Sequence, residues 1–453
     1  MSIKKMLYLL LAILIVVALL AACGSTPEPT QAPSPAEPTA TKEAKAETPT
    51  EAPKTEEVVH LKLWMLADDT TNPVFQKYVD SFNEANPNIQ VEMETYPNEA
   101  YKTAIQVAVA SDESPDVFFN WSGDDTARFV KEGNVLDLTG YGQEYGWFDD
   151  ISAAALDAYT LDGKLYGMPY TLHSKYFFYN TAVFEENGLE PPETFDELLV
   201  LCGDLAETGM IPISFGNSER WQGVHYISIL NQKMAGEDNI AADYTLSAPP
   251  DQLFADEGYV AALQKLLDMQ EAGCFAPGVN ATDPATAWAQ FYTEQAAMTY
   301  AGTWGFGIFD SNGFEGRYGI FPMPKTPDGK GNQDYIWLSP DGIEVSAKTE
   351  YPDEAARFVD HFVSAENQKM LVEELGSVPV REVEAEMSEV LAYAANDVAN
   401  AQGTAPVIDV LLENSVSEVY LNVIQEVLGG TKTPQEAMDA VREQALKVQQ
   451  EMQ

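Results

Sequence analysis

Strand-like and helix-like patterns alternate along the chain from about residue 58 onward. Residues 58–65 and 89–94 alternate apolar and polar side chains, as half-buried strands do, and residues 116–119 form a short apolar run. Apolar residues at helical spacing lie between them, at residues 73–86 and 101–110. Strands and helices that alternate at this spacing predict an α/β fold, in which helices cover both faces of a mostly parallel sheet.

Three loops are expected beyond the carboxyl ends of such strands, where open α/β sheets bind their ligands. They span residues 64–69, 120–125 and 302–307, and each contains a tryptophan. Trp304 follows an apolar strand pattern and lies between glycines. Glycine lets the backbone approach a ligand closely, and an indole ring covers an apolar face while excluding water. The sequence therefore predicts a ligand site with accessible indole faces.

The first 22 residues have the layout of a secretory signal. Lys4 and Lys5 precede an apolar run at residues 9–22, and small residues come directly before Cys23. Leu-Ala-Ala-Cys resembles the bacterial lipoprotein box, which implies cleavage after residue 22 and lipidation of Cys23. The alternative is an uncleaved membrane helix, which the small residues and the missing stop-transfer charges disfavour. We predict an exported protein on the extracytoplasmic face of the cell membrane, anchored through acyl chains on Cys23.

Residues 23–57 differ in composition from the rest of the chain. Proline recurs among Thr, Ala, Glu and Ser, and the segment contains no aromatic residue. Such a sequence cannot bury enough apolar surface to offset the entropy lost on ordering. We predict a disordered, semi-extended linker here. The remaining chain, from about residue 58, is long enough for two lobes.

The charge and the missing motifs exclude several functions. The formal net charge of −46 makes nucleic acid and anionic lipid surfaces poor partners. A Gly-rich loop followed by Lys-Ser/Thr, a GxSxG sequence and an HExxH sequence are all missing. The four histidines lack metal-ligand spacing, and there is no CxxC pair. We therefore predict neither catalytic residues nor a cofactor nor a metal.

Cys202 and Cys274 are the cysteines that remain beyond Cys23. In an exported protein they can pair as a disulfide. Alternatively, each is a small buried apolar residue. Two cysteines without a dense framework carry little information about pairing. We favour the unpaired interpretation.

Ordered motifs along the chain from Val58 onward resemble one known family. They are LKLW, FQKYVDSFNEANPNIQVEM, SPDVFFNWSGD, VLDLT, GKLYGMPYTLHSKYFFYNTAVFEENGLEPPETFDELL, EQAAMTYAGTW and FPMPKTPDGKG. In this order and spacing they are similar to an extracellular solute-binding protein of family 1, the maltose-binding and multiple-sugar-binding kind that serves ABC importers. No single motif is diagnostic, and the resemblance is carried by their order.

The resemblance implies a periplasmic-binding-protein-like fold, with two α/β lobes joined by hinge strands and a ligand cleft between them. Carried over by motif, the N-terminal lobe spans residues 58–170 and 325–376, and the C-terminal lobe spans residues 174–320 and 380–453. Hinges are expected near residues 170–174, 320–324 and 376–380. The implied function is a receptor that captures a carbohydrate and delivers it to the permease subunits of an ABC importer with their ATPase. A monomer is expected.

The resemblance also implies the residues that contact the ligand. Trp304 occupies the position of a tryptophan that stacks on a sugar ring. Asn120, Trp121 and Asp124 lie where the family's first-lobe loop supplies an aromatic ring and a sugar-binding carboxylate. Trp64 and Asp68 follow the first strand. Trp221 and Trp337 lie in segments that reach the cleft in relatives, with core packing as the alternative, whereas Trp147 and Trp288 are assigned to packing.

His173 departs from the family pattern. It occupies a hinge position where the maltose-binding members carry a glutamate, and this puts a maltose-like ligand in doubt. A neutral imidazole both donates and accepts hydrogen bonds, so His173 is either a ligand contact or a satisfied hinge residue. The alternatives to a sugar receptor are the same fold with a cationic or peptide-like ligand and, with less support, a secreted carbohydrate-active enzyme.

Overall fold

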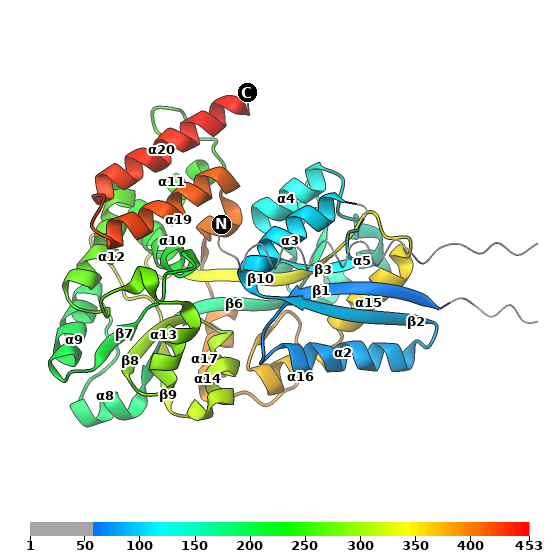
Figure 1. Cartoon of the computed structure of the whole chain (residues 1–453), viewed down its shortest axis with the longest axis horizontal. Helices are drawn as coiled ribbons and strands as arrows, with labels where there is room; N and C mark the ends of the chain where they lie inside the picture. The colour runs from blue at the N-terminus through cyan, green and yellow to red at the C-terminus, as the bar shows by residue number, and fades with distance from the viewer. Residues whose placement is uncertain (1–57, 112, 453) are drawn as a thin grey trace, which may run out of the picture. The chain divides into compact units, whose positions relative to one another are not determined.

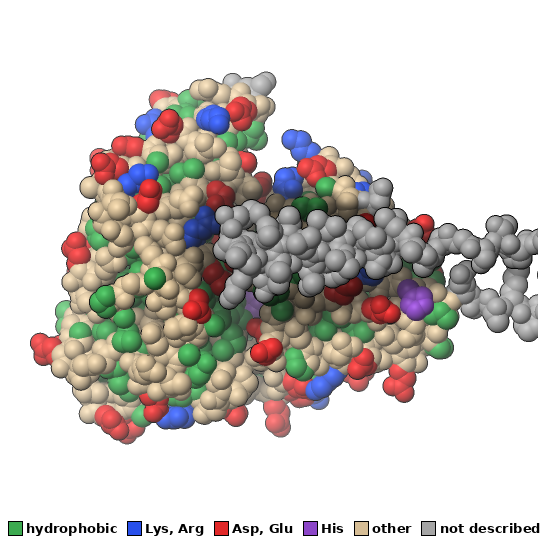
Figure 2. Space-filling model, viewed as in Figure 1, with side chains coloured by type: hydrophobic (Ala, Val, Ile, Leu, Met, Phe, Trp, Pro, Cys, Tyr) green, Lys and Arg blue, Asp and Glu red, His purple; other side chains and the backbone are tan. Residues whose placement is uncertain are grey.

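The computed structural model describes residues 58–111 and 113–452. The predicted signal peptide, the lipidated Cys23 and the linker at 23–57 lie outside the described residues and stay predictions. Among the described residues, no helix has both the length and the apolar character needed to cross a bilayer. Acidic side chains are scattered over both halves of the face in Figure 2, and basic side chains are sparser there.

The first half of the body is built on a mixed sheet with the strand order β2-β1-β3-β10-β6. β1 pairs in parallel with β2 and β3, whereas β10 runs antiparallel to β3 and β6. Helices lie above and below these strands in Figure 1. The elements are β1 (Val59–Leu66), α2 (Asn72–Ala85), β2 (Ile89–Tyr96), α3 (Asn98–Ala110), β3 (Val117–Asn120), α4 (Gly123–Lys131), α5 (Thr139–Tyr145), α6 (Trp147–Asp150), α7 (Ala153–Asp157), β4 (Thr160–Leu161), β5 (Lys164–Leu165), β6 (Gly167–Asn180), β10 (Ile336–Val345), α15 (Pro352–Phe362), α16 (Ala365–Leu375) and β11 (Val378–Pro379).

The second half extends the same sheet through β8 and β7 and surrounds it with helices. α10 is buried along nearly its whole length and lies at the centre of this half. The elements are α8 (Thr181–Asn187), α9 (Phe195–Glu207), β7 (Ile211–Ser214), α10 (Trp221–Ala235), α11 (Glu237–Tyr244), α12 (Glu257–Glu271), η1 (Val279–Ala281), α13 (Pro284–Tyr292), β8 (Ala296–Gly302), α14 (Gly305–Phe309), η2 (Asp310–Phe314), β9 (Tyr318–Phe321), α17 (Glu389–Ala399), β12 (Thr404–Ala405), α18 (Ile408–Leu411), α19 (Asn414–Leu428) and α20 (Pro434–Glu451).

Local sequence explains why these elements form. α2 starts with Pro73 in its first turn, where a proline costs no hydrogen bond. Its buried residues recur at intervals of three and four and therefore share one face: Val74, Phe75, Tyr78, Val79 and Phe82. β8 is buried along its whole length, as expected for a strand in the interior of an α/β sheet. The predicted α/β fold is confirmed, but the sheet is mixed rather than mostly parallel, because β6 and β10 run antiparallel to their neighbours β3 and β8 and to each other. Two hydrophobic clusters form the core, and the cluster of the first half continues into the second half at Phe291, Phe309 and Phe314.

β6 links the two halves. Its residues 167–174 pair with β10, and its residues 175–179 pair with β8. Figure 1 shows β6 and β10 running from one half to the other. β11 also pairs with β6, at Thr171 and Leu172. The strands that cross between the halves therefore lie side by side.

One predicted lobe boundary differs from the observed packing. Residues 325–335 pack on the second half, because Lys325 exchanges backbone hydrogen bonds with the 193–195 segment and Lys330 N donates to Met234 O. The chain instead returns from the second half to the first within β10. Trp337 of β10 pairs with β12, and the next residue, Leu338, pairs with β6.

Cys202 and Cys274 form a disulfide, so the unpaired interpretation was wrong. Cys202 lies on α9, and Cys274 follows the end of α12, where its carbonyl accepts a hydrogen bond from Ile213 N of β7. Packing of α9 and residue 274 beside β7 brings the two Cα atoms to 4.8 Å across a separation of 72 residues. Spacing in the sequence does not reveal such a distance.

We expect the disulfide to stabilise the second half mainly by restricting the unfolded chain. A closed loop of this length predicts a contribution of about 4 kcal/mol. The Cys202→Ala/Cys274→Ala variant should unfold at a lower urea concentration than the parent, with the free energy of unfolding reduced by up to this amount. Coinciding unfolding curves of the variant and the oxidised parent would contradict this expectation.

Candidate ligand-binding site

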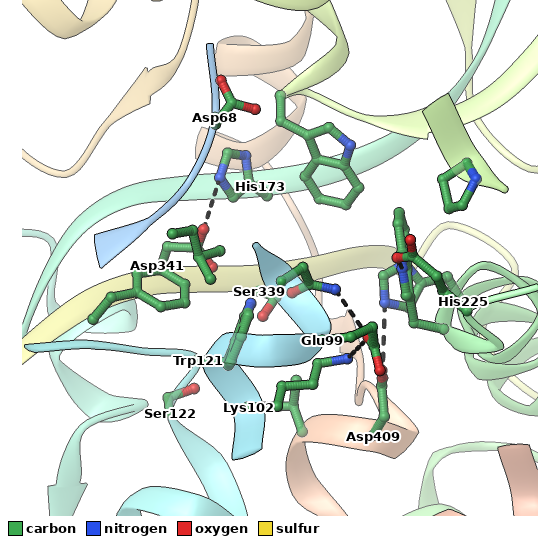
Figure 3. A pocket seen from close by; sticks show the side chains of 18 of the residues that line it. Asp68, Glu99, Lys102, Trp121, Ser122, His173, His225, Ser339, Asp341 and Asp409 are labelled. Carbon is green, nitrogen blue, oxygen red and sulfur yellow. Dashed lines mark hydrogen bonds and ion pairs between the residues drawn. The ribbon is translucent and has the colours of Figure 1, made fainter. Parts of the chain in front are cut away.

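A cavity of about 710 Å³ lies between the two halves. Its volume is within the range of small-molecule sites. Both halves and the crossing strands supply its walls, and Figure 3 shows some of their side chains pointing into it. The residues used below are Asp68, Glu99, Lys102, Trp121, Asp124, His173, Glu219, Arg220, Trp221, His225, Trp288, Trp304, Trp337, Asp341 and Asp409.

Tryptophans form one wall of the cavity. Trp304 lies at the centre, with ring centroids 6.2 Å from Trp221 and 6.1 Å from Trp337, and Trp288 lies 6.2 Å beyond Trp221. Trp304 is half-buried directly after β8, where its ring folds back over Gly302. A Cβ atom at Gly302 would lie 2.1 Å from this ring, so a larger residue would displace it. The glycine beside Trp304 therefore orients the indole.

Trp121 lies on the first half, directly after β3. Its ring packs edge-on against Phe119, with centroids 4.6 Å apart, and against Tyr101. Lys102 Nζ on α3 lies 5.8 Å from the Trp121 ring centroid. Trp121 is only partly buried, so part of it stays accessible to a ligand.

Carboxylates from the first half and the crossing strands also line the cavity. One oxygen of Asp68 accepts hydrogen bonds from Thr70 N and Thr71 N, both at 2.8 Å, and so fixes the turn that leads into α2. Asp341 lies on β10, with Oδ2 3.3 Å from His173 Nε2. His173 Nδ1 lies 2.9 Å from Thr303 Oγ1. Both ring nitrogens of His173 therefore have protein partners, while the ring lies edge-on to Trp304.

Asp124 connects the two halves. It lies in the first turn of α4, and its Oδ2 accepts a hydrogen bond from Asn414 N, the first residue of α19, at 3.2 Å. Burial, together with the nearby carboxylates Asp125 and Glu413, raises the pKa of Asp124 to about 6. Gly123 lies so close to Val410 that a Cβ atom would come within 2.1 Å of its carbonyl oxygen. The halves are therefore in contact along this edge of the cavity.

Most of the predicted residues meet at the cavity: Asp68, Trp121, Asp124, His173, Trp221, Trp304 and Trp337. Trp64 and Asn120 are not among its lining residues. The Trp64 ring packs on Tyr96, with centroids 4.7 Å apart. Asn120 is buried and its amide is used internally, because Nδ2 donates to Glu344 and Thr126 while Oδ1 accepts from Trp121 N. Asn120 therefore orients the Trp121 loop and leaves no free group for a ligand.

Several residues that line the cavity were not predicted from the sequence. Trp288, assigned to packing, lines the cavity from α13, and its Nε1 is buried without a partner. His225 lies on α10, and Asp409 lies on the single turn of α18. Their helices reach the cavity only through tertiary packing. Trp147 is buried in the first half, where its Nε1 donates to Asp360 Oδ1, and its assignment to packing is confirmed.

The described residues contain no obvious metal site. Within residues 58–111 and 113–452, no group of three or more His, Cys, Asp and Glu side chains is placed to hold a metal ion. The side chains that line the cavity include aromatic rings, carboxylates and imidazoles. Such a set can cover an apolar ligand face and form hydrogen bonds at its edges.

Comparison with known proteins identifies the family. Residues 77–401 match the family model of the bacterial extracellular solute-binding proteins. The chain belongs to this family. The predicted resemblance to extracellular solute-binding proteins is thereby confirmed.

Individual relatives have related names. An uncharacterized ABC transporter extracellular-binding protein of Pyrococcus horikoshii is 28% identical over 72% of this chain and 74% of its own length. The multiple sugar-binding protein of Streptococcus mutans is 25% identical over 64% of this chain and 68% of its own. A solved structure from work on xylan utilization by Caldanaerobius polysaccharolyticus has a TM-score of 0.80 and 26% identity, and covers 85% of this chain and 99% of its own.

A buried carboxyl group stabilises the loop that carries Trp121 through hydrogen bonds. Glu344 on β10 is fully buried, and its Oε1 accepts hydrogen bonds from Asn120 and Thr126, on either side of the Ser122–Gly123 turn. Its Oε2 has no partner. Burial raises the pKa of Glu344 from its ordinary 4.5 to about 7, although the two hydrogen bonds oppose this shift.

We expect Glu344 to make folding stability depend on pH. The folded protein holds the proton between pH 4.5 and about 7 while the unfolded chain has released it, so stability falls as the pH rises through this window. The shift corresponds to about 3 kcal/mol. Glu344→Gln retains an acceptor oxygen and should reduce this loss, measured by urea unfolding at pH 5 and pH 8. Glu84→Gln, at an exposed carboxylate, is the control and should leave the loss unchanged.

Proposed function

We propose that this protein is an extracytoplasmic receptor that captures a carbohydrate between its two halves and delivers it to an ABC importer. It binds without turning over its ligand. The predicted lipid anchor at Cys23 would keep it at the cell surface, and it would act as a monomer. The observation that carries this proposal is the wall of tryptophans that lines the cavity across from Trp121.

The chemistry of the cavity suits a sugar. A pyranose has a face of C–H groups and a rim of hydroxyls. Indole faces such as that of Trp304 cover the C–H face, and removing this apolar area from water contributes about 25 cal/mol per Å². Asp68, Asp124 and Asp341 provide acceptors for the hydroxyls. Relatives named for their sugars are consistent with this, among them the galactooligosaccharide-binding protein of Bacillus subtilis, which is 24% identical.

The contacts between the halves suit a cleft that closes on its ligand. Asp124 meets Asn414 on one edge. Gly307 approaches Thr70 on another, where an added Cβ atom would lie 3.0 Å from Thr70 Cγ2. A ligand that touches both halves binds the closed arrangement more tightly and shifts the population toward it. The outer surfaces of both halves, in the closed arrangement, would then be presented to the permease.

A cationic solute is the second candidate. Among the residues that line the cavity, carboxylates outnumber basic side chains. The two basic lining residues are already paired, Lys102 with Glu99 and Arg220 with Glu418. An acidic, aromatic cavity can also hold an organic cation. The two candidates differ in their dependence on salt, because screening weakens the attraction of a cation and leaves stacking on a neutral sugar almost unchanged.

We expect a neutral mono- or oligosaccharide to raise the melting temperature and to shift the tryptophan emission. The binding constant should change little between low and high sodium chloride concentrations. A suitable panel contains xylose, xylotriose, maltotriose, raffinose and galactobiose, with choline and spermidine as cations. Binding of a cation alone, weakened strongly by salt, would replace the sugar proposal with the second candidate.

Trp304→Ala should weaken sugar binding tenfold to a thousandfold, equivalent to about 1.4–4 kcal/mol. The loss follows from removing the ring at the centre of the tryptophan wall. Isothermal titration calorimetry measures it, and the melting temperature reports whether the variant stays folded. Trp64→Phe is the matched control, since Trp64 packs on Tyr96 outside the cavity lining and its replacement should leave affinity unchanged.

A further inference from the structure

Asp409 lines the cavity and lies on a short turn that is fixed by contacts with the core. It lies on α18, a single helical turn between β12 and α19. The preceding residue, Ile408, is fully buried, and its N–H donates to Ser228 Oγ at 3.1 Å within the core. Figure 3 shows Asp409 and His225 side by side at the cavity. The position of the carboxylate is therefore set by the core of the second half.

One oxygen of this carboxylate has no hydrogen-bond partner. Asp409 Oδ1 is buried, and His225 Nε2 lies 3.7 Å away, too far for a hydrogen bond. Burial raises the pKa of Asp409 to about 6, although Lys102 and Lys175 oppose the shift. Leaving a buried acceptor unpaired costs free energy, so a partner is expected from outside the protein.

Lys175 lies behind the cavity wall, where burial lowers the pKa of its amino group well below the usual range. It is buried on β6, and its Nζ has no hydrogen-bond partner. Nζ lies 4.8 Å from the Tyr300 ring centroid and 5.7 Å from the centroids of Trp221 and Trp304. Aromatic rings thus separate Lys175 from the ligand space.

Hydrogen-bond donors without partners lie on the same wall. The Nε1–H groups of Trp288 and Trp337 are buried donors without partners, and Nδ1 of His225, which donates or accepts according to the tautomer, is also unpartnered. Burial lowers the pKa of His225 well below its usual range, so this imidazole is neutral. The wall therefore offers both donors and an acceptor. A hydroxyl group can satisfy both kinds, whereas a cationic group only donates and an anionic group only accepts.

Resting on the proposed function, we infer that Asp409 is a specificity-determining contact for an uncharged, hydroxyl-rich sugar. Its free Oδ1 accepts a hydrogen bond from a ligand hydroxyl, and the indole N–H groups of Trp288 and Trp337 donate to neighbouring ligand oxygens. A hydroxyl-bearing ligand leaves none of these groups unpaired. A cation would leave the indole donors unpaired, and an anion would face the Asp409 carboxylate.

The test uses calorimetry on the mature, full-length chain with xylotriose, maltotriose, raffinose and galactobiose as probes. Asp409→Asn keeps the shape of the side chain and removes the charged acceptor, and it should weaken binding of the recognised sugar by about tenfold to a hundredfold. Trp337→Phe keeps an aromatic ring without the N–H and should weaken binding about threefold to tenfold. Asp397→Asn is the matched control, because Asp397 accepts from Tyr176 outside the cavity lining.

The outcomes separate this inference from the proposed function. If the parent binds a sugar and both cavity variants lose affinity while the control does not, the inference is supported. If the parent binds a sugar and folded Asp409→Asn binds it equally well, the inference is overturned and the receptor function stands. If the parent binds no sugar of the panel but binds choline or spermidine, both the proposed function and the inference fail.

Discussion

The structure depends on one strand that belongs to both halves. β6 pairs with β10 over its first part and with β8 over its second, so a single run of backbone hydrogen bonds joins the two cores. Residues near this change of partner form part of the cavity wall, with His173 facing the ligand space and Lys175 behind the aromatic rings. Any motion that opens the cleft must therefore change the backbone near these side chains.

The two halves contribute different chemistry to the cavity. The wall of tryptophans includes Trp288 and Trp337, whose buried N–H groups are left without partners, and the second half adds the Asp409 carboxylate. The first half presents Trp121 and carboxylates on turns, supported from below by Glu344. Apolar faces supply most of the binding energy of a sugar. Unpaired polar atoms supply selectivity, because burying such an atom without a hydrogen-bond partner costs free energy, and a ligand that does not pair with it binds more weakly.

Several of the predicted site residues that line the cavity lie beyond strand ends. Trp304 and Asp68 directly follow buried strands, and the direction of a strand in an α/β sheet fixes where its carboxyl end points. Asn120 also lies at a strand end but does not line the cavity, because its amide donates a hydrogen bond to Glu344, a residue more than two hundred positions away in the sequence. Trp288 and Asp409 lie on helices, and which face of a helix meets a cavity is decided by the packing of other elements.

The sequence alone determined the alternation of strands and helices, the family and the chemical types of many side chains that line the cavity, because these follow from local periodicity and from ordered motifs. Tertiary structure decided the Cys202–Cys274 pairing, the later return crossing within β10 and the polar atoms that remain free for a ligand. Each of these depends on distances between segments far apart in the chain. The sequence shows which residues are adjacent along the backbone, whereas the cavity is formed by residues that are adjacent only in the folded structure.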